Sequence, residues 1–312
     1  MIRMTDPGRR EMAVLRVGVR RAASIVASAT ALLLILGCGD NPDSGTETPS
    51  PQSPSGSQAS PTSSELNGTF NVNGRDLFLS CTGTGEPTVI LEAGEAVPSS
   101  AMDGVRAAYD SDLRVCSYNR ANQGNSGSAP TPRTADDLIQ DLHGLLAAAK
   151  VPGKYLLVGH SAGGILVQAY AAAFPGEVAG VVALNPVPPW GQWSTLGFSK
   201  ITAEERRGET DYYAGQNGES LNYRDISERI KSLQVPSGIP FHVLISTTAQ
   251  CDSPGDICNR TYPAYETINK KIAGQWTEGR YSQVDAPHEI YYANLAKVQE
   301  VIDEVLSRAG GR

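Results

Sequence analysis

The sequence lacks the excess of positive charge that nucleic-acid-binding domains carry. It has 26 lysine and arginine residues against 33 aspartate and glutamate residues, a net charge of −7 at pH 7. Residues 1–37 hold six of the basic and two of the acidic residues, so the rest of the chain has 20 basic and 31 acidic residues and a net charge of −11. A surface that follows phosphates needs clustered cations. We therefore expect no nucleic-acid partner.

The apolar run near the N-terminus is too short for a comfortable membrane span. The stretch from Ala22 to Leu36 has about 15 residues, whereas a spanning helix needs about 20. Arginines precede this run, and that order predicts a signal peptide over residues 1–37. The ending Ile-Leu-Gly-Cys38 resembles a bacterial lipoprotein cleavage site, which implies that Cys38 carries a lipid. The alternative is an ordinary signal peptide followed by an unrelated cysteine.

Residues 40–64 have almost no large apolar side chains. They are mostly serine, proline, threonine, glycine, glutamine and acidic residues, which cannot offset the entropy of ordering by burying apolar surface. We predict a flexible tether over residues 38–64 and one folded domain over residues 65–312. The expected location is the outer face of a bacterial cell membrane, which the protein contacts only through its N-terminal lipid.

The five cysteines match no usual spacing of zinc ligands. If Cys38 carries the lipid, four cysteines remain, namely Cys81, Cys116, Cys251 and Cys258. Export favours disulfides over zinc thiolates. Four cysteines allow three pairings, and their spacing alone does not choose among them.

From residue 66 onward, short apolar strands alternate with helices of apolar periodicity. The strands are predicted at 66–72, 76–81, 88–92, 113–118, 155–158, 178–184, 241–245 and 281–284, and the helices at 99–110, 134–150, 162–174, 263–273 and 289–307. This alternation predicts an α/β fold, with a mostly parallel central sheet, an N-terminal antiparallel hairpin and helices on both faces. Thr134 is the expected N-cap of the second helix. The periodicity lapses at about 186–236, an aromatic-rich segment that we interpret as a lid insertion over the sheet.

The run Gly159-His160-Ser161-Ala162-Gly163 lies between a predicted buried strand and a helix of small residues. Gly-x-Ser-x-Gly in this context is typical of a nucleophile elbow, a sharp turn that exposes the serine hydroxyl. Glycines flank the serine because side chains there would collide with neighbouring backbone. The turn predicts Ser161 as a nucleophile, and it places the Ala162 amide at a helix N-terminus, where it can bind an oxyanion.

A serine nucleophile needs an adjacent base, and the sequence has four histidines. His143 lies inside a predicted helix, His160 inside the turn itself and His242 inside an apolar strand. His288 follows the last predicted strand and precedes the last helix. Catalytic groups in open α/β sheets gather at the carboxyl ends of strands. We therefore predict His288 as the general base.

The acid that orients the histidine is expected between the serine and the histidine, at another strand end. Asn185 follows one such strand but cannot carry charge. Asp252 follows the strand at 241–245 and is the favoured acid, with Asp256 as the alternative; both also lie in a segment that favours turns. Asp285 shares the loop of the histidine, which gives poor geometry for a triad.

Two further motifs resemble the α/β-hydrolase superfamily. The Glu-Ala-Gly of residues 92–94 stands where one branch of the superfamily has its oxyanion loop, and residues 117–126 resemble its Tyr-Asp-Arg-x-Gly-x-Gly-x-Ser segment. Asn119 and Asn122 depart from that pattern, in which aspartate and glycine are usual. The resemblance implies that the backbone amide of Glu95 is the second donor of the oxyanion hole.

The resemblance extends over about residues 66–308 and also bears on the cysteines. The second and fourth strands are neighbours in that fold, which implies a disulfide between Cys81 and Cys116. Cys251 and Cys258 then form a second disulfide, which closes a short loop around the favoured acid and limits its movement.

These residues together predict a serine hydrolase that cleaves carboxylic esters or related small acyl compounds through an acyl-enzyme. Ser161 is the expected nucleophile, His288 the base and Asp252 the orienting acid, and this chemistry needs no metal or organic cofactor. Peptidase, thioesterase, lactonase and acyltransferase activities use the same triad and stay open. A surface-anchored binding protein that kept the fold without the chemistry is the alternative of a different class. The sequence leaves the oligomeric state open.

Overall fold

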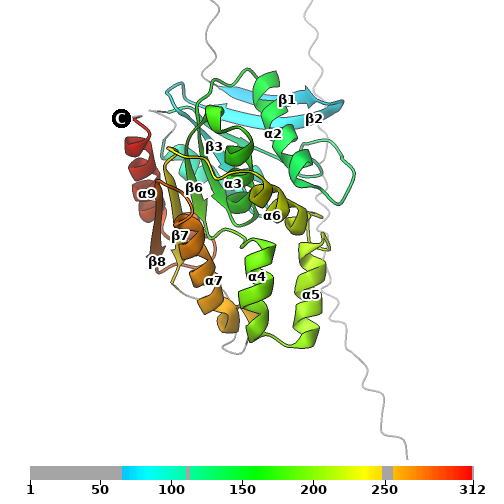
Figure 1. Cartoon of the computed structure of the whole chain (residues 1–312). Helices are drawn as coiled ribbons and strands as arrows, with labels where there is room; N and C mark the ends of the chain where they lie inside the picture. Colours follow the sequence, from blue (N-terminus) through cyan, green and yellow to red (C-terminus); the bar gives the residue numbers. More distant parts are fainter. Residues whose placement is uncertain (1–64, 110–112, 248–255, 311–312) are drawn as a thin grey trace, which may run out of the picture. The chain divides into compact units, whose positions relative to one another are not determined.

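One mixed β-sheet organises the part of the chain that the computed structural model describes, residues 65–109, 113–247 and 256–310 (Figure 1). Its strands are β1 (Leu66–Val72), β2 (Arg75–Thr82), β3 (Thr88–Glu92), β4 (Val115–Tyr118), β5 (Tyr155–His160), β6 (Val178–Leu184), β7 (Phe241–Ser246) and β8 (Gly279–Val284). Their spatial order is β1-β2-β4-β3-β5-β6-β7-β8. The pairs β1–β2 and β2–β4 are antiparallel and the remaining neighbours are parallel. The predicted α/β architecture with an antiparallel N-terminal hairpin is confirmed.

Helices cover both faces of this sheet. They are α1 (Asp103–Ala107), α2 (Ala135–Ala148), α3 (Ala162–Ala173), α4 (Trp190–Leu196), α5 (Ala203–Tyr213), α6 (Tyr223–Ser232), α7 (Ile257–Ala273), α8 (Ile290–Ala293) and α9 (Leu295–Arg308), with 3-10 turns η1 (Ser99–Met102), η2 (Pro175–Glu177) and η3 (Gly197–Lys200). Helices α2, α3 and α7 bury their apolar sides in one core, and α1, α8 and α9 bury theirs in a second. Strand β3 separates the two, since Ile90 points into the first core while Val89 and Leu91 point into the second.

Local signals set several helix ends. The Thr134 side chain accepts from the Asp137 amide and the Asp137 side chain accepts in return from the Thr134 amide, a capping box that starts α2. The single helix predicted at 289–307 is instead two, because Asn294 ends α8 and caps the start of α9 with its side chain. The helix predicted at 99–110 is a 3-10 turn followed by the short α1.

The insertion at 186–236 is more regular than the sequence indicates. It forms α4, η3, α5 and α6, of which α4 and α5 extend beyond the carboxyl ends of the strands (Figure 1). Helix α5 buries only Tyr213 among its residues, so it shows no apolar periodicity. Aromatic rings from several insertion elements hold it together, with Tyr213 packed in tilted or edge-to-face contacts against Trp190, Tyr212 and Tyr223 at centroid distances of 5.2 to 5.8 Å.

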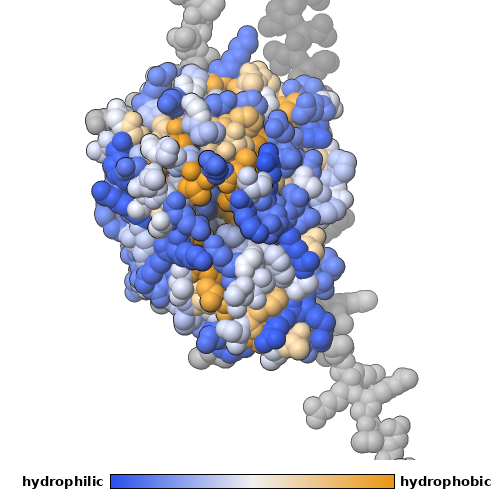
Figure 2. Space-filling model, in the orientation of Figure 1, coloured by the Kyte–Doolittle hydropathy of each residue, from blue (hydrophilic) through white to orange (hydrophobic). Residues whose placement is uncertain are grey.

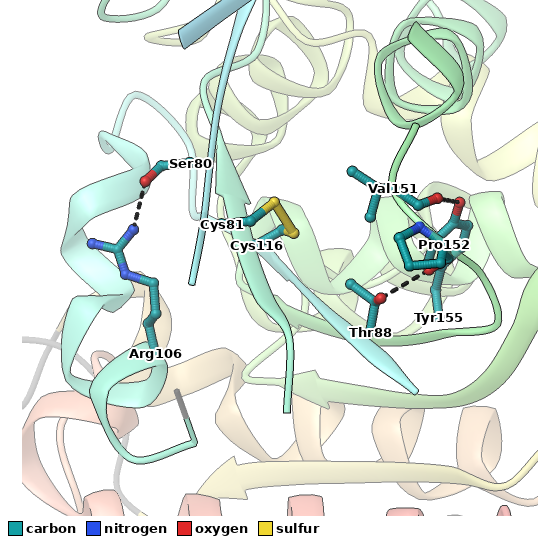
Figure 3. Close-up of a disulfide and its surroundings, with 8 residues drawn as sticks. All are labelled: Ser80, Cys81, Thr88, Arg106, Cys116, Val151, Pro152 and Tyr155. Carbon is teal, nitrogen blue, oxygen red and sulfur yellow. Dashed lines mark hydrogen bonds between the residues drawn. A yellow bond between two sulfur atoms is a disulfide. The ribbon is translucent and has the colours of Figure 1, made fainter. Parts of the chain in front are cut away.

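The disulfide between Cys81 and Cys116 is present in the structure (Figure 3). The two residues are direct partners in the antiparallel register of β2 and β4, as the family resemblance implies. Cys258, at the start of α7, is also disulfide-bonded. Its expected partner Cys251 lies outside the described residues, as do the predicted signal peptide, Cys38, which is predicted to carry a lipid, and the predicted tether.

The face that Figure 2 presents is mostly hydrophilic, with apolar residues grouped near its centre. Few large apolar side chains in the described chain are well exposed, and these include Val235 and Tyr292. None of the helices in the described ranges combines the length and the apolar character that crossing a membrane requires.

Candidate active site

Ser161 occupies the turn between β5 and α3 in a conformation that non-glycine residues rarely adopt. Its φ is +52° and its ψ is −114°. Three backbone hydrogen bonds hold the turn: the Ser161 amide donates to the Leu184 carbonyl at 2.9 Å, and the Ser161 carbonyl accepts from Gly164 and Val187 at 3.0 Å. A strained residue held this firmly at a strand end is a mark of a functional site.

The flanking glycines are required by close backbone approach. A Cβ at Gly159 would lie 2.2 Å from the Gly163 carbonyl oxygen, and one at Gly163 would lie 2.1 Å from the Glu92 carbonyl oxygen. Neither contact involves a side chain that could move away. The predicted reason for both glycines, collision of a side chain with neighbouring backbone, is therefore confirmed.

Ser161 and His288 line the same cavity, which has a volume of about 270 Å³. His288 lies on the loop between β8 and α8, at the carboxyl end of the sheet. The insertion contributes apolar and aromatic side chains and α7 contributes the opposite wall, and the lining also includes Asn185, Pro186, Val187, Pro188, Trp193, Tyr212, Ser246, Cys258, Thr261, Tyr262 and Tyr265. The predicted nucleophile and base thus share one mostly apolar chamber.

Asn185 and Ser246 anchor the loop that carries His288. The Asn185 side-chain amide donates to the His288 carbonyl at 3.0 Å and to the Ser246 hydroxyl at 2.8 Å. The Ser246 hydroxyl donates in turn to the Pro287 carbonyl at 3.0 Å. The Asn185 amide carries no charge and cannot act as the acid of a triad, but its N–H groups hold the loop of the base.

His160 is the third anchor of that loop. Its Nε2 lies 2.8 Å from the His288 carbonyl oxygen, which assigns the ring proton to Nε2. Burial, with a smaller effect of His288, lowers the pKa of His160 to about 3. His160 is therefore a neutral donor at pH 7. The sequence placed it in the turn correctly but offered no signal of this contact, because the two histidines are far apart along the chain.

Burial also lowers the pKa of His288, and the nearby carboxylate of Glu289 opposes that effect. A lowered pKa keeps the imidazole unprotonated at neutral pH. A neutral imidazole is the form that can accept the proton of a serine hydroxyl.

The identity of the acid stays a prediction. Asp252 lies outside the described residues. Asp256 is the N-cap residue of α7, and Asp285 is exposed and accepts from the Thr247 hydroxyl at 3.4 Å. Cys258, which lies six residues after the favoured acid in the sequence, lines the cavity.

The predicted oxyanion-hole residues are Ala162, which follows Ser161 in the chain, and Glu95, which follows Gly94. Ala162 is the first residue of α3 and is fully buried. A Cβ built on Gly94, the residue before Glu95, would be 3.2 Å from His160 Nδ1 and 3.6 Å from the Ser161 Cβ, so Gly94 lies beside the nucleophile turn.

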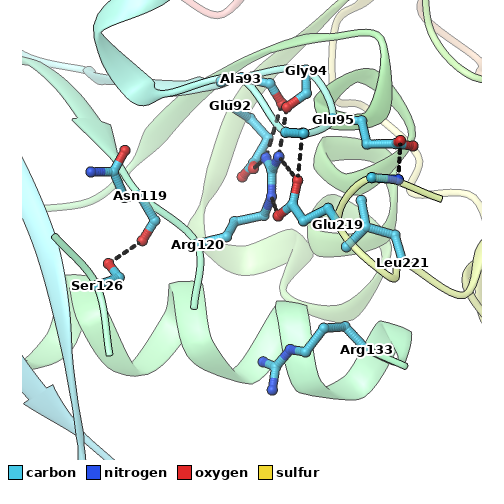
Figure 4. Close-up of polar contacts among 12 residues, drawn as sticks. Glu92, Ala93, Gly94, Glu95, Asn119, Arg120, Ser126, Arg133, Glu219 and Leu221 are labelled. Carbon is cyan, nitrogen blue, oxygen red and sulfur yellow. Dashed lines mark hydrogen bonds and ion pairs between the residues drawn. The ribbon is translucent and has the colours of Figure 1, made fainter. Parts of the chain in front are cut away.

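A buried charged cluster lies behind this segment (Figure 4). Arg120 pairs with Glu92 and with Glu219, both at 2.5 Å, and all three side chains are almost fully inaccessible. Burial disfavours the charged guanidinium, but the two carboxylates outweigh it and raise the pKa of Arg120. Burial raises the pKa of Glu92, against the opposing effect of Arg120. Sequence reasoning did not single out Arg120 or Glu219 for a role.

The two departures from the family motif have local structural reasons. Asn122 has a φ of +71°, a conformation that asparagine tolerates better than other side chains, and its Oδ1 accepts from the Ala129 amide at 2.8 Å. The Asn119 Oδ1 accepts from the Ser99 amide at 3.0 Å. Both asparagines therefore stabilise loops rather than take part in chemistry.

His242 belongs to a second cluster that resembles a triad. Its Nδ1 lies 2.6 Å from Glu304 and its Nε2 lies 2.8 Å from the Ser282 hydroxyl. Within the described ranges, none of these three residues lines the cavity of Ser161. Glu304 is also paired with Arg280 and Arg308, and the cluster joins α9 to the sheet. His242 is a satisfied structural residue, as its place in an apolar strand predicts.

Residues 90–198 match the family described as alpha/beta hydrolase fold. An uncharacterized protein of Bacillus subtilis (strain 168) is 34% identical over 104 residues, which are 33% of this chain and 41% of that protein. An AB hydrolase superfamily protein of Gibberella zeae is 31% identical over 116 residues, 35% of this chain and 36% of that protein. The chain thus spans less than half the length of these relatives.

A solved structure, the enol-lactonase from Burkholderia xenovorans LB400, has the same fold. The TM-score is 0.52 with 19% identity, over 77% of this chain and 98% of that chain. The match over residues 90–198 and this shared architecture agree with the α/β-hydrolase fold that the sequence motifs indicate. The relatives named as hydrolases further support an enzyme.

Proposed function

We propose that the protein is a serine hydrolase that cleaves carboxylic esters or related small acyl compounds. One observation carries this proposal: Ser161, in its strained turn, and His288, at the end of the last strand, line one apolar cavity. Serine chemistry with a neutral histidine base needs this arrangement.

The reaction proceeds in two halves. His288 takes the hydroxyl proton as Ser161 attacks the acyl carbon, and the amides of Ala162 and Glu95 stabilise the oxyanion. His288 then gives the proton to the leaving alcohol, which leaves an acyl-enzyme. A water molecule, deprotonated by His288, attacks that ester and releases the carboxylic acid and free Ser161. Asp252 orients His288 in this proposal and stabilises its charged form.

The cavity favours an uncharged acyl group of moderate size. An engineered apolar cavity of about 150 Å³ holds a benzene molecule. A chamber of about 270 Å³ with walls of Val187, Trp193 and Tyr265 therefore fits an acyl group of roughly eight to ten carbon atoms, or an aryl-acetyl group. We propose that the insertion acts as a lid over this chamber. We also propose that the enzyme is exported and anchored to the outer face of the cell membrane through a lipid on Cys38.

The test is a matched pair of serine variants in the purified folded protein. Ser161→Ala should abolish turnover of p-nitrophenyl esters and labelling by a fluorophosphonate probe. Ser282→Ala removes a serine hydroxyl that is hydrogen-bonded to His242 away from the cavity, and it should leave both unchanged. Wild-type protein that neither turns over a panel of acyl esters nor reacts with the probe would instead support a binding protein on the same fold.

A further inference from the structure

Every N–H group of the buried Arg120 guanidinium has an acceptor. Nε donates to Glu219 Oε1 at 2.5 Å, and Nη1 donates to Glu92 Oε1 at 2.5 Å and to the Ala93 carbonyl at 2.9 Å. Nη2 donates to the Gly94 carbonyl and to Glu219 Oε2, both at 2.6 Å. A guanidinium has five N–H donors in a fixed planar fork, and here all five are used. The position of Arg120 is thereby fixed, and with it that of the two carbonyl groups it holds.

The carbonyl group of Gly94 decides where the Glu95 amide points. The Gly94–Glu95 peptide is not among the cis bonds of the described chain, and in a trans peptide the C=O and the following N–H point in opposite directions. Because Arg120 binds the Gly94 oxygen, the Glu95 N–H points away from Arg120. A Cβ built on Gly94 would lie 3.2 Å from His160 Nδ1 and 3.6 Å from the Ser161 Cβ, so this peptide begins beside the nucleophile.

The carboxylate that holds Arg120 comes from the insertion. Glu219 lies between α5 and α6, its side chain is 1% exposed, and its Oε2 also accepts from the Ala96 amide at 2.9 Å. The Glu95 side chain accepts in turn from the hydroxyl groups of Tyr212 and Tyr223, both at 2.7 Å. Tyr212 also lines the cavity. Two carboxylates therefore join the insertion to the loop after β3. Glu219 belongs to the insertion, and Glu95 belongs to the loop.

We propose that Arg120 and Glu219 are positioning residues that orient the Glu95 amide toward the oxyanion, so that the insertion completes the oxyanion hole of the enzyme. The inference rests on the proposed serine hydrolase function. It assigns the insertion a part in the chemical step in addition to covering the substrate. A change in the insertion that disturbs Glu219 then acts on kcat even when the apolar walls of the cavity stay intact.

The test compares Glu219→Gln with Asp141→Asn in the full-length protein. Asp141 is a matched control, since it is also a buried carboxylate held by arginines, Arg133 and Arg75, and it makes no contact with the oxyanion loop in the described chain. Loss of one oxyanion-hole donor costs about 10²- to 10³-fold in kcat. We expect Glu219→Gln to lower kcat by about 10-fold or more and to leave KM within about twofold. Arg120→Lys, which keeps the charge but loses the planar fork, should lower kcat by about 10²-fold.

A covalent probe separates positioning from folding. The rate of fluorophosphonate labelling, which also forms an oxyanion-like adduct on Ser161, should fall in parallel with kcat in Glu219→Gln. Asp141→Asn should lower the melting temperature without changing either rate per folded molecule. Equal losses of kcat in the two variants, or a rise in KM alone in Glu219→Gln, would overturn the inference.

The outcomes also distinguish this inference from the proposed function. A wild-type protein without turnover or labelling contradicts the function itself, whereas an active wild type with an unimpaired Glu219→Gln contradicts only the role of the insertion. If Glu219→Gln does not fold, Tyr223→Phe tests the same link. This change removes one of the hydroxyl groups that donate to the Glu95 carboxylate and keeps the buried ring of residue 223. It should lower kcat by a few fold with KM unchanged. An unchanged kcat in Tyr223→Phe counts against the inference.

Discussion

The Nε2 atom of His160 lies 2.8 Å from the carbonyl oxygen of His288, so the residue before the nucleophile holds the backbone of the base. The two imidazole rings are 4.7 Å apart and tilted by 57°. Asn185, from the end of β6, donates to the same oxygen at 3.0 Å. Donors from two neighbouring parallel strands thus fix one point on the loop after β8. That loop has no regular structure of its own to position a catalytic group.

Replacement of His160 by alanine should impair the chemical step. His160→Ala removes one of two donors to the His288 carbonyl and leaves space beside the base, and a misplacement of about 1 Å can cost up to 10²-fold in rate. We expect kcat for a p-nitrophenyl ester to fall by about 10-fold or more. His160→Gln can supply an amide N–H to the same oxygen and should retain more activity. Equal activity in the two variants would show that the contact does not position the base.

The lowered pKa of His160 predicts loss of stability in acid. The folded protein holds this group near pKa 3, whereas the unfolded chain has the ordinary value of 6.5, so the unfolded chain binds the proton more readily. The contribution to folding is complete above pH 6.5 and decreases as the pH falls from 6.5 toward 3, by about 1.4 kcal/mol per unit for one histidine. Burial lowers the pKa of His242 and His288 as well, which adds to the effect in the same direction.

Urea unfolding at several pH values between 7 and 4.5 measures this effect. As the pH falls, the free energy of unfolding of His160→Gln should decrease less steeply than that of the wild type. The two slopes should differ by close to the value for one proton, about 1.4 kcal/mol per pH unit. Carboxylates titrate in both proteins, so the difference between the two curves isolates the histidine. Parallel curves would mean that His160 has the same pKa in the folded protein and in the unfolded chain, contrary to the lowering expected from its burial.

The residues that sequence reasoning found and those it missed differ in how they are recognised. Ser161 stands in a short sequence motif. Its two glycines are required because a side chain there would collide with nearby backbone or with the adjacent strand, so the motif can be recognised from the sequence alone. His288 follows from its place after a strand. Glu219 contacts Arg120 across 99 residues of sequence, from the loop between α5 and α6, and no local pattern marks it. The strands are short apolar runs, so a local pattern predicts them. Helix α5 buries only Tyr213 among its residues, so no such pattern predicts it.

Asn185 illustrates the same limit, and it yields a prediction. Asn185→Asp is a nearly isosteric change that introduces the charge a triad acid would have. A carboxylate cannot donate to the His288 carbonyl or to the Ser246 hydroxyl, so both buried acceptors lose a partner. We expect a loss of about 1–3 kcal/mol in the free energy of unfolding and a lower kcat. Activity above that of the wild type would identify position 185 as a latent acid site and would argue against a distant acid.

The size of the cavity predicts how acyl preference can be changed. Val187 lines the cavity next to the elbow, and its backbone amide donates to the Ser161 carbonyl, so its Cα position is fixed. Val187→Phe places a larger side chain in a chamber of about 270 Å³ and keeps the backbone contact. Because one methylene in an apolar pocket changes kcat/KM by about 10- to 200-fold, esters of long acyl chains should lose most. We expect kcat/KM for an octanoyl ester to fall by about 10-fold or more while that for an acetyl ester stays within about twofold.

Val187→Ala, the opposite change, should leave kcat/KM for the acetyl ester unaffected and raise it for esters of longer acyl chains. Loss of activity on both esters in Val187→Phe would indicate that the acyl group binds elsewhere in the cavity and that Val187 borders the nucleophile instead.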